Sequence, residues 1–216
     1  MNNTPFCEIL TLRRIDSVPE MRLTELLAFD ARERVKSFLS EKRRADFLWA
    51  RLLLLMMAKE RSLTELTFKE NPPYSPEVAS VRPLYCSISH TKTFVGAALS
   101  TSPVAIDLEV IREDRPMDAI SERCFGIDFL GNFRDCDRTL AFYKAWGIHE
   151  CAVKLKGKML RTGKILSIRM PEENEAVRIT HCPVGEKTLC TLASAGGFTA
   201  RPRTTTLAQI KETLLA

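Results

Sequence analysis

Residues 84–109 read LYCSISHTKTFVGAALSTSPVAIDLE, and this stretch decides the fold. It contains three short apolar runs, Leu84–Ser89, Phe94–Ser100 and Val104–Glu109, which are joined by brief polar connections. Short runs of this kind, bounded by turn-forming residues, predict β-strands. Because the connections HTKT and TSP are so short, we expect the three strands to pair in order as an antiparallel meander.

Helical patterns flank these strands on both sides. Residues 41–60 and 137–156 each carry apolar positions at helical spacing, which predicts two long helices. Shorter helical patterns lie at 19–38 and 117–130, and further strand-like runs lie at 6–12, 165–170, 177–180 and 188–193. One long helix and several strands in each half predict an α+β fold of two similar halves packed together. The Pro103 region is the expected boundary between an N-terminal half, 1–103, and a C-terminal half, 104–216.

The composition is that of an ordinary globular protein. The 216 residues include 32 Lys+Arg and 27 Asp+Glu, which gives a formal net charge of +5, and 45% are hydrophobic. This balance excludes disordered, collagen-like and coiled-coil chains. The positive excess hints at an anionic partner, but the sequence lacks the basic patches interleaved with aromatic residues that are typical of nucleic-acid binding.

The cysteines and the N-terminus bear on the compartment. Seven cysteines are scattered without any C-x-x-C pair, which excludes a zinc ribbon and a disulfide framework and fits a reducing compartment. The first residues, MNNTPFCEILTLRR, lack the pattern of a signal peptide. The most apolar run, Leu52–Ala58, is too short to cross a bilayer. We therefore expect a cytoplasmic protein without a membrane or nucleic-acid partner.

Two acidic residues share one face of the third predicted strand. Alternation in Val104–Glu109 places Asp107 and Glu109 on the face opposite to Ile106 and Leu108. Their separation of roughly 7 Å would allow both carboxylates to bracket a hard cation such as Mg²⁺. The simpler alternative is a solvated strand face, and a lone D-x-E does not decide between the two.

A further acidic residue lies on the second predicted long helix, on the same face as a lysine. Glu150 and Lys154 are four residues apart, so their side chains project from the same helix face. An ordinary surface ion pair is the alternative. His149-Glu150 also begins like the H-E-x-x-H motif of zinc proteases, but Val153 stands where the second histidine is required.

The sequence Ser87-Ile88-Ser89-His90 ends the first strand of the meander. Two hydroxyls and an imidazole next to a tight turn suit the binding of a phosphate group. A structural turn histidine is the alternative. A serine nucleophile is disfavoured because no G-x-S-x-G motif is present.

In order and spacing, these motifs resemble the 4′-phosphopantetheinyl transferases of the Sfp type. That family has a basic helix with F-L-x-G/A-R, then S-x-S-H, then G-[IV]-D-[IL]-E, and then W-x-x-K-E-[AS]-x-x-K-x-x-G-K-G-L. This chain has FLWAR at 47–51, SISH at 87–90, AIDLE at 105–109 and WGIHECAVKLKGKML at 146–160. The resemblance runs from about Arg43 to Leu160. It implies the family's fold, a pseudo-duplication with the active site where the two halves meet.

The resemblance also implies a reaction. Members of the family transfer phosphopantetheine from coenzyme A (CoA) to a serine of an apo acyl or peptidyl carrier protein and release 3′,5′-ADP. Asp107, Glu109 and Glu150 would bind Mg²⁺. Glu150 would also take the serine proton, directly or through water, and Lys154 would stabilise the phosphoryl charge.

The same resemblance assigns the CoA contacts and the partner. Ser89 and His90, together with Arg44 and Arg51 of the basic helix, would bind the phosphates and the adenosine end of CoA. The partner would be an acidic carrier protein of fatty-acid, polyketide or non-ribosomal peptide synthesis. Three arginines that follow the strand of Asp107 and Glu109 could contribute to the docking of this carrier protein: Arg112, Arg115 and Arg123. Two halves in one chain favour a monomer.

The chain departs from the family pattern in several places. Asn71-Pro72-Pro73 replaces G-K-P, which changes the expected adenine side of the CoA pocket. His149 replaces a lysine, so a permanent charge becomes pH-dependent. Cys151 and Met159 replace small residues, which packing should tolerate. Asn71-Pro72-Pro73 and His149 favour the alternative function, a degenerate paralogue that binds CoA or a carrier protein without transferring the group.

Overall fold

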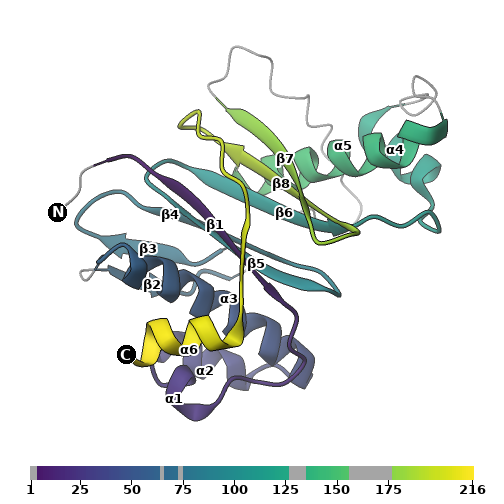
Figure 1. Cartoon of the computed structure of the whole chain (residues 1–216). Coiled ribbons are helices and arrows are strands. Elements are labelled where there is room, and N and C mark those ends of the chain that lie inside the picture. Colours follow the sequence, from purple (N-terminus) through teal and green to yellow (C-terminus); the bar gives the residue numbers. More distant parts are fainter. Residues whose placement is uncertain (1–3, 64–65, 73–74, 127–134, 156–176) are drawn as a thin grey trace.

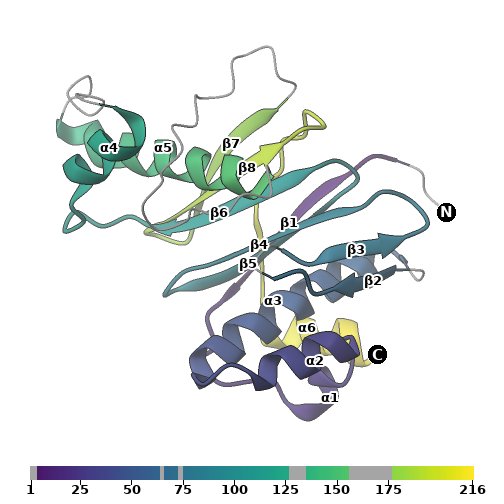
Figure 2. The same cartoon turned by 180° about the vertical axis from the view of Figure 1, so that it is seen from behind.

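A computed structural model of the chain describes residues 4–63, 66–72, 75–126, 135–155 and 177–216. These residues form six helices and nine strands in three sheets, so the predicted α+β class is confirmed (Figures 1 and 2). The helices are α1 (Met21–Thr24), α2 (Phe29–Lys36), α3 (Glu41–Glu60), α4 (Met117–Phe125), α5 (Asp135–Leu155) and α6 (Leu207–Leu215). The strands are β1 (Cys7–Arg13), β2 (Leu66–Lys69), β3 (Glu77–Ser80), β4 (Tyr85–His90), β5 (Phe94–Ser100), β6 (Val104–Val110), β7 (Arg178–Val184), β8 (Thr188–Ser194) and β9 (Arg203–Thr205).

The first sheet has the strand order β4-β5-β1-β9 and is covered on one side by α1, α2, α3 and α6 (Figures 1 and 2). Helix α3 is capped at its N-terminus by Ser40, whose hydroxyl accepts a hydrogen bond from the backbone N–H of Arg43. The helix is apolar around most of its circumference, because the sheet lies on one side of it and other helices on the other. Its consecutive residues Leu52, Leu53 and Leu54 are all fully buried. Burial of each leucine contributes about 1.5–3 kcal/mol.

The second sheet has the order β6-β8-β7, and α5 packs against one of its faces (Figure 2). The strands pair antiparallel, with Asp107 opposite Thr191. Helix α5 lies close to β8 because Gly147 faces Thr191 without a side chain. A Cβ atom at position 147 would fall on Oγ1 of Thr191 and only 2.8 Å from its Cβ. This close approach brings the end of α5 next to Asp107.

The two sheets meet through side chains rather than through a backbone ladder. The hydroxyl oxygens of Ser87 and Ser89 on β4 each accept a hydrogen bond of 3.0 Å, from the backbone N–H groups of Ile106 and Leu108 on β6. The predicted meander is therefore right for β4 and β5, which pair antiparallel, and wrong for β6, which pairs with β8. A layer of apolar residues also joins the sheets: it includes Ile9, Ala98, Ile106, Leu108, Cys190 and Leu192.

The end of the chain returns to the first sheet. Strand β9 pairs in parallel with β1. Ile210 and Leu214 of α6 share a buried core with Leu10 and Leu12 of β1. The last elements thus pack on the N-terminal sheet, and the division into 1–103 and 104–216 stays a prediction.

Several other predicted elements correspond to helices and strands of the structure. The helix predicted at 117–130 is α4, and the strand-like runs at 177–180 and 188–193 belong to β7 and β8. The run at 165–170 and the motif end at 157–160 lie outside the described residues. Strands β2 and β3 pair antiparallel and were not predicted from the sequence, because four residues are too few to establish a period. Among the described residues, every helix is too short or too polar to cross a membrane.

Candidate functional site

A cavity of about 400 Å³ lies where the end of β4, the strand β6 and the helix α5 come together. Five of the predicted site residues line it: Ser89, His90, Asp107, Glu109 and Glu150. A sixth, Lys154, contacts Asp107 from the side. The structure therefore brings together residues that lie more than 60 positions apart in the chain, and each comes from one of the predicted motifs.

Asp107 is the most deeply buried carboxylate of the site, with 6% of its surface exposed. Its Oδ1 atom lies 2.9 Å from Nζ of Lys154 and accepts a longer hydrogen bond, 3.3 Å, from the hydroxyl of Ser89. Its Oδ2 atom is buried and has no hydrogen-bond partner among the described residues. A buried acceptor without a donor is unfavourable, so this oxygen is available to a ligand with positive charge.

Lys154 is held in place by two acceptors on β6. Besides Asp107, its ammonium group donates a hydrogen bond of 2.7 Å to the backbone carbonyl of Ile106. Burial by itself would lower the pKa of Lys154, but the negative charges of Asp107 and Glu150 outweigh it, so its pKa is raised. The side chain therefore stays positively charged at neutral pH.

Glu109 is held at both oxygens. The indole N–H of Trp146 donates to Oε1 over 2.7 Å, and the guanidinium of Arg115 donates to Oε2 over 3.2 Å. Burial and the nearby charge of Asp107 raise the pKa of Glu109, and Arg115 works against this rise.

Glu150 is the unrestrained carboxylate of the three. No hydrogen bond or ion pair to its side chain is present within the described part of the chain. Burial, followed by the charge of Asp107, raises the pKa of Glu150, and the ammonium of Lys154 opposes this. A carboxylate with a raised pKa and without a fixed partner is suited to accept a proton.

The donor set suits a hard divalent cation, because three carboxylates face one cavity and Oδ2 of Asp107 has no hydrogen-bond partner in the described ranges. The three side chains nevertheless stand apart from one another in the cavity. Among the described residues, no three carboxylate, imidazole or thiol groups are as close as a bound metal ion requires. A metal would have to gather these ligands, and the unrestrained Glu150 can move most easily.

Arg44 and Arg51, the two arginines of the basic helix that were assigned to CoA, do not line this cavity. Arg51 is buried, and its guanidinium forms a two-point contact with Glu70, at 2.9 and 2.8 Å. Arg34 contacts the same carboxylate at 2.8 Å, and the ring of Phe47 lies 3.6 Å from the Arg51 guanidinium carbon. Arg44 donates to the backbone carbonyl of Phe38 at 3.2 Å. The assignment of Arg44 and Arg51 to CoA thus stays a prediction.

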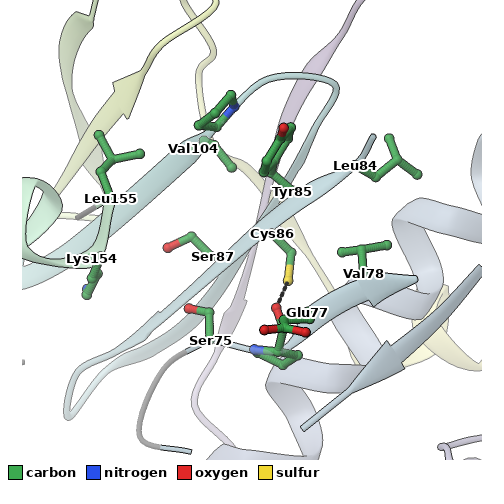
Figure 3. Close-up of a pocket in the computed structure, with 12 residues that line it drawn as sticks. Ser75, Glu77, Val78, Leu84, Tyr85, Cys86, Ser87, Val104, Lys154 and Leu155 are labelled. Carbon is green, nitrogen blue, oxygen red and sulfur yellow. Dashed lines mark hydrogen bonds between the residues drawn. The ribbon is translucent and has the colours of Figure 1, made fainter. Parts of the chain in front are cut away.

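A second cavity, of about 510 Å³, lies on another side of Lys154 (Figure 3). Figure 3 shows Tyr85 and Ser87 of β4 on one side of it and Lys154 and Leu155 of α5 on the other. Ser75 and Pro76 also line it; they follow Asn71-Pro72-Pro73, which stands where the family pattern has G-K-P. The loop is attached to β4 by a hydrogen bond of 3.0 Å from the thiol of Cys86 to the carbonyl of Pro76. Lys154 therefore lines this second cavity and also contacts Asp107, which lines the first.

Sequence reasoning missed the contact of Arg115 with Glu109. The sequence indicated only that Arg115 is a basic residue that could contact a carrier protein. The two residues are six positions apart, but Glu109 lies in a strand and Arg115 in the loop that follows, so no periodicity relates their side chains. The sequence also did not show that Ser89 contacts Asp107.

Comparison with known proteins gives one distant similarity. No family model matches the chain. Over 119 residues the chain is 29% identical to the 4′-phosphopantetheinyl transferase psf-1 of Bacillus pumilus. The match covers 53% of this chain and 50% of that protein, so the chain spans about half the length of this curated relative.

Proposed function

We propose that this protein transfers the 4′-phosphopantetheine group of CoA to a serine of an apo acyl or peptidyl carrier protein, with Mg²⁺ as cofactor. The observation that carries the proposal is the gathering of Ser89, His90, Asp107, Glu109 and Glu150 around one cavity, with Lys154 on Asp107. The distant homology to a 4′-phosphopantetheinyl transferase points in the same direction.

In this proposal the two cavities take different parts of CoA. The pyrophosphate lies in the carboxylate-lined cavity, which Lys92, Arg112 and Arg115 also line with positive charge. The adenine end lies in the second cavity, against Tyr85 and the loop at Ser75. Lys154 lines the second cavity, contacts Asp107 of the first, and would bind a phosphate between them. Arginine and lysine side chains bind phosphate oxygens through charge-assisted hydrogen bonds.

Asp107, Glu109 and Glu150 would hold the metal ion. A bound Mg²⁺ supplies charge neutralisation on the pyrophosphate and orients the phosphorus for attack. The unpaired Oδ2 of Asp107 and the unrestrained carboxylate of Glu150 support this assignment.

The proposed transfer step is a displacement at phosphorus. The serine Oγ of the carrier protein attacks the phosphorus that bears the pantetheine arm. An Oγ–P bond forms while the bond from this phosphorus to the bridging oxygen breaks, and that oxygen leaves with 3′,5′-ADP. The serine proton passes to Glu150, directly or through a water molecule, which the raised pKa of this carboxylate supports. Lys154 stabilises the negative charge on the phosphoryl oxygens.

The partner in this proposal is a carrier protein that is acidic around its modified serine. Arg112 and Arg123 follow β6 in the chain and would face this acidic surface of the carrier protein. We also propose that the chain acts as a monomer of two related halves, with the transfer site where the two sheets meet.

The test is to incubate apo carrier proteins of several pathways with CoA, Mg²⁺ and the purified protein, and to weigh the products. The proposal predicts a mass gain of one phosphopantetheinyl group and release of 3′,5′-ADP. Absence of any gain across all carriers would contradict it. The rival function, binding without transfer, predicts CoA or carrier binding by calorimetry together with no product.

A further inference from the structure

Both carboxylate oxygens of Glu109 have a donor from another element of the chain. Trp146 of α5 donates to Oε1, and Arg115, in the loop between β6 and α4, donates to Oε2. A carboxylate oxygen has more than one acceptor position. A donor on each oxygen therefore fixes the orientation of the group and still leaves lone pairs for a cation in the cavity.

Arg115 is itself fixed by an aromatic surface on α5. Its guanidinium carbon lies 4.8 Å from the ring centre of Trp146, 5.3 Å from that of Phe142 and 5.6 Å from that of Tyr143. Contacts of a guanidinium with aromatic rings at these distances are attractive. About a fifth of the Arg115 side chain is exposed, so the group lies at the edge of the site and not in bulk solvent. Arg115 thus connects the loop, α5 and Glu109.

The three carboxylates are restrained to different degrees. Asp107 is paired with Lys154, Glu109 is held at both oxygens, and Glu150 has no hydrogen-bond partner among the described residues. Glu109 is thus held at both oxygens before a metal binds, whereas Asp107 is held only at Oδ1. Groups that orient a ligand in this way contribute to metal affinity without touching the metal.

We infer that Arg115 is a positioning residue that holds Glu109 in its orientation toward the metal site. The inference rests on the proposed function, because it requires that Glu109 binds Mg²⁺. It predicts that loss of the Arg115 guanidinium weakens Mg²⁺ binding even when CoA and carrier protein are absent.

The experiment compares Arg115→Gln with Arg112→Gln. Arg112 lines the same cavity and carries the same charge, but its side chain pairs with the exposed Asp114 and not with a site carboxylate. Mg²⁺ is titrated into each protein and followed by the fluorescence of Trp146, which touches Glu109; Trp49 is buried elsewhere and serves as a constant background. Binding of free Mn²⁺, measured by electron paramagnetic resonance, is the second readout.

The expected result is a Kd for Mg²⁺ that is about 10- to 100-fold higher in Arg115→Gln than in Arg112→Gln, at equal thermal stability. Arg115→Lys should recover only part of the affinity, because an ammonium cannot reproduce the stacked planar contact. Equal Kd values for the two glutamine variants would overturn the inference. Tighter binding in Arg115→Gln would also overturn it and would show that the guanidinium competes with the metal.

The outcomes separate this inference from the proposed function. Mg²⁺ binding that depends on Arg115 in a protein that modifies no carrier would support the positioning role and contradict the transferase. Absence of Mg²⁺ and Mn²⁺ binding in the unsubstituted protein would contradict the positioning role itself. Carrier modification that proceeds unchanged in Arg115→Gln, at limiting Mg²⁺, would leave the transferase standing and the positioning role disproved.

Discussion

Nζ of Lys154 lies 2.9 Å from Oδ1 of Asp107, across 47 residues of sequence. The contact joins the end of α5 to the centre of β6 and neutralises a carboxylate that is almost completely buried. Removal of one member of such a pair leaves the other charge without compensation.

Replacement of Lys154 by Met should therefore destabilise the protein. We expect a loss of about 1–3 kcal/mol in the free energy of unfolding, because Asp107 would remain buried with an unmet charge. Denaturant unfolding measures this loss. Lys144→Met, at an exposed position of the same helix, is the matched control and should change little. The double variant Lys154→Met/Asp107→Leu should recover stability; a double variant as unstable as the single one would contradict this account.

Ser87 and Ser89 form a natural pair for a second test. Each hydroxyl accepts a backbone N–H of β6 at 3.0 Å, but only Ser89 also contacts Asp107. Replacement of either serine by Ala should lower stability by a similar amount, about 1–3 kcal/mol, because a buried N–H loses its acceptor. Only Ser89→Ala should also reduce the rate of transfer. Equal rates in the two variants would show that the Ser89 contact with Asp107 has no functional role.

Glu150→Gln should separate activity from stability. Loss of the proton acceptor should reduce the transfer rate about 10²- to 10⁴-fold. The free energy of unfolding, in contrast, should increase. Because burial and Asp107 raise the pKa of Glu150, the folded protein binds a proton there more tightly than the unfolded chain does. The ionised carboxylate of Glu150 thus destabilises the folded protein. This destabilisation develops as the pH rises from below 4.5, the ordinary pKa of a glutamate, to above the raised pKa of Glu150.

The measurement is thermal unfolding of Glu150→Gln and the unsubstituted protein across pH, without metal. We expect the variant to be more stable at pH 7, and the difference to disappear at a pH below about 4, where the glutamate is protonated in both states. A variant less stable than the parent at neutral pH would contradict the account of the carboxylate cluster.

Gly147 should not tolerate a methyl group. On helix propensity alone, Gly→Ala in a helix interior would stabilise by about 0.8–1.0 kcal/mol. Here the new Cβ would fall against Thr191, so we expect a net loss of about 1–3 kcal/mol, measured by denaturant unfolding. The displaced helix should also weaken transfer. Addition of Thr191→Ala removes the nearest atom and should recover part of the loss; no recovery would mean that the contact is not the cause.

The pairing of Arg51 with Glu70 gives a test of the predicted CoA role of Arg51. Both side chains are almost completely buried, but Arg34 still pairs with Glu70, so Arg51→Met should cost about 1–3 kcal/mol of stability. The exposed pair of Arg61 with Glu8 is the control, where Arg61→Met should cost at most about 1 kcal/mol. Weaker CoA binding without any loss of stability would instead favour a direct contact of Arg51 with CoA.

Local patterns in the sequence were sufficient for much of the fold. The helices at 41–60 and 135–155 and the strands β4, β5 and β6 follow from apolar spacing and turn residues, because these signals arise between neighbours in the chain. Alternation also placed Asp107 and Glu109 on one face of β6, and both line the same cavity. Strands β2 and β3 were not predicted, because a hydrophobic period cannot be recognised reliably in four residues.

The sequence by itself thus determined which residues carry acidic, basic and hydroxyl groups and on which face of each element they lie. The tertiary structure decided which of them meet: β6 pairs with β8 and not with β5, Arg51 is paired with Glu70, and Arg115 with Glu109. The physical reason is that backbone periodicity depends on adjacent residues, whereas these contacts depend on how two sheets and a helix pack. The packing is set by distant features such as the missing side chain of Gly147 opposite Thr191.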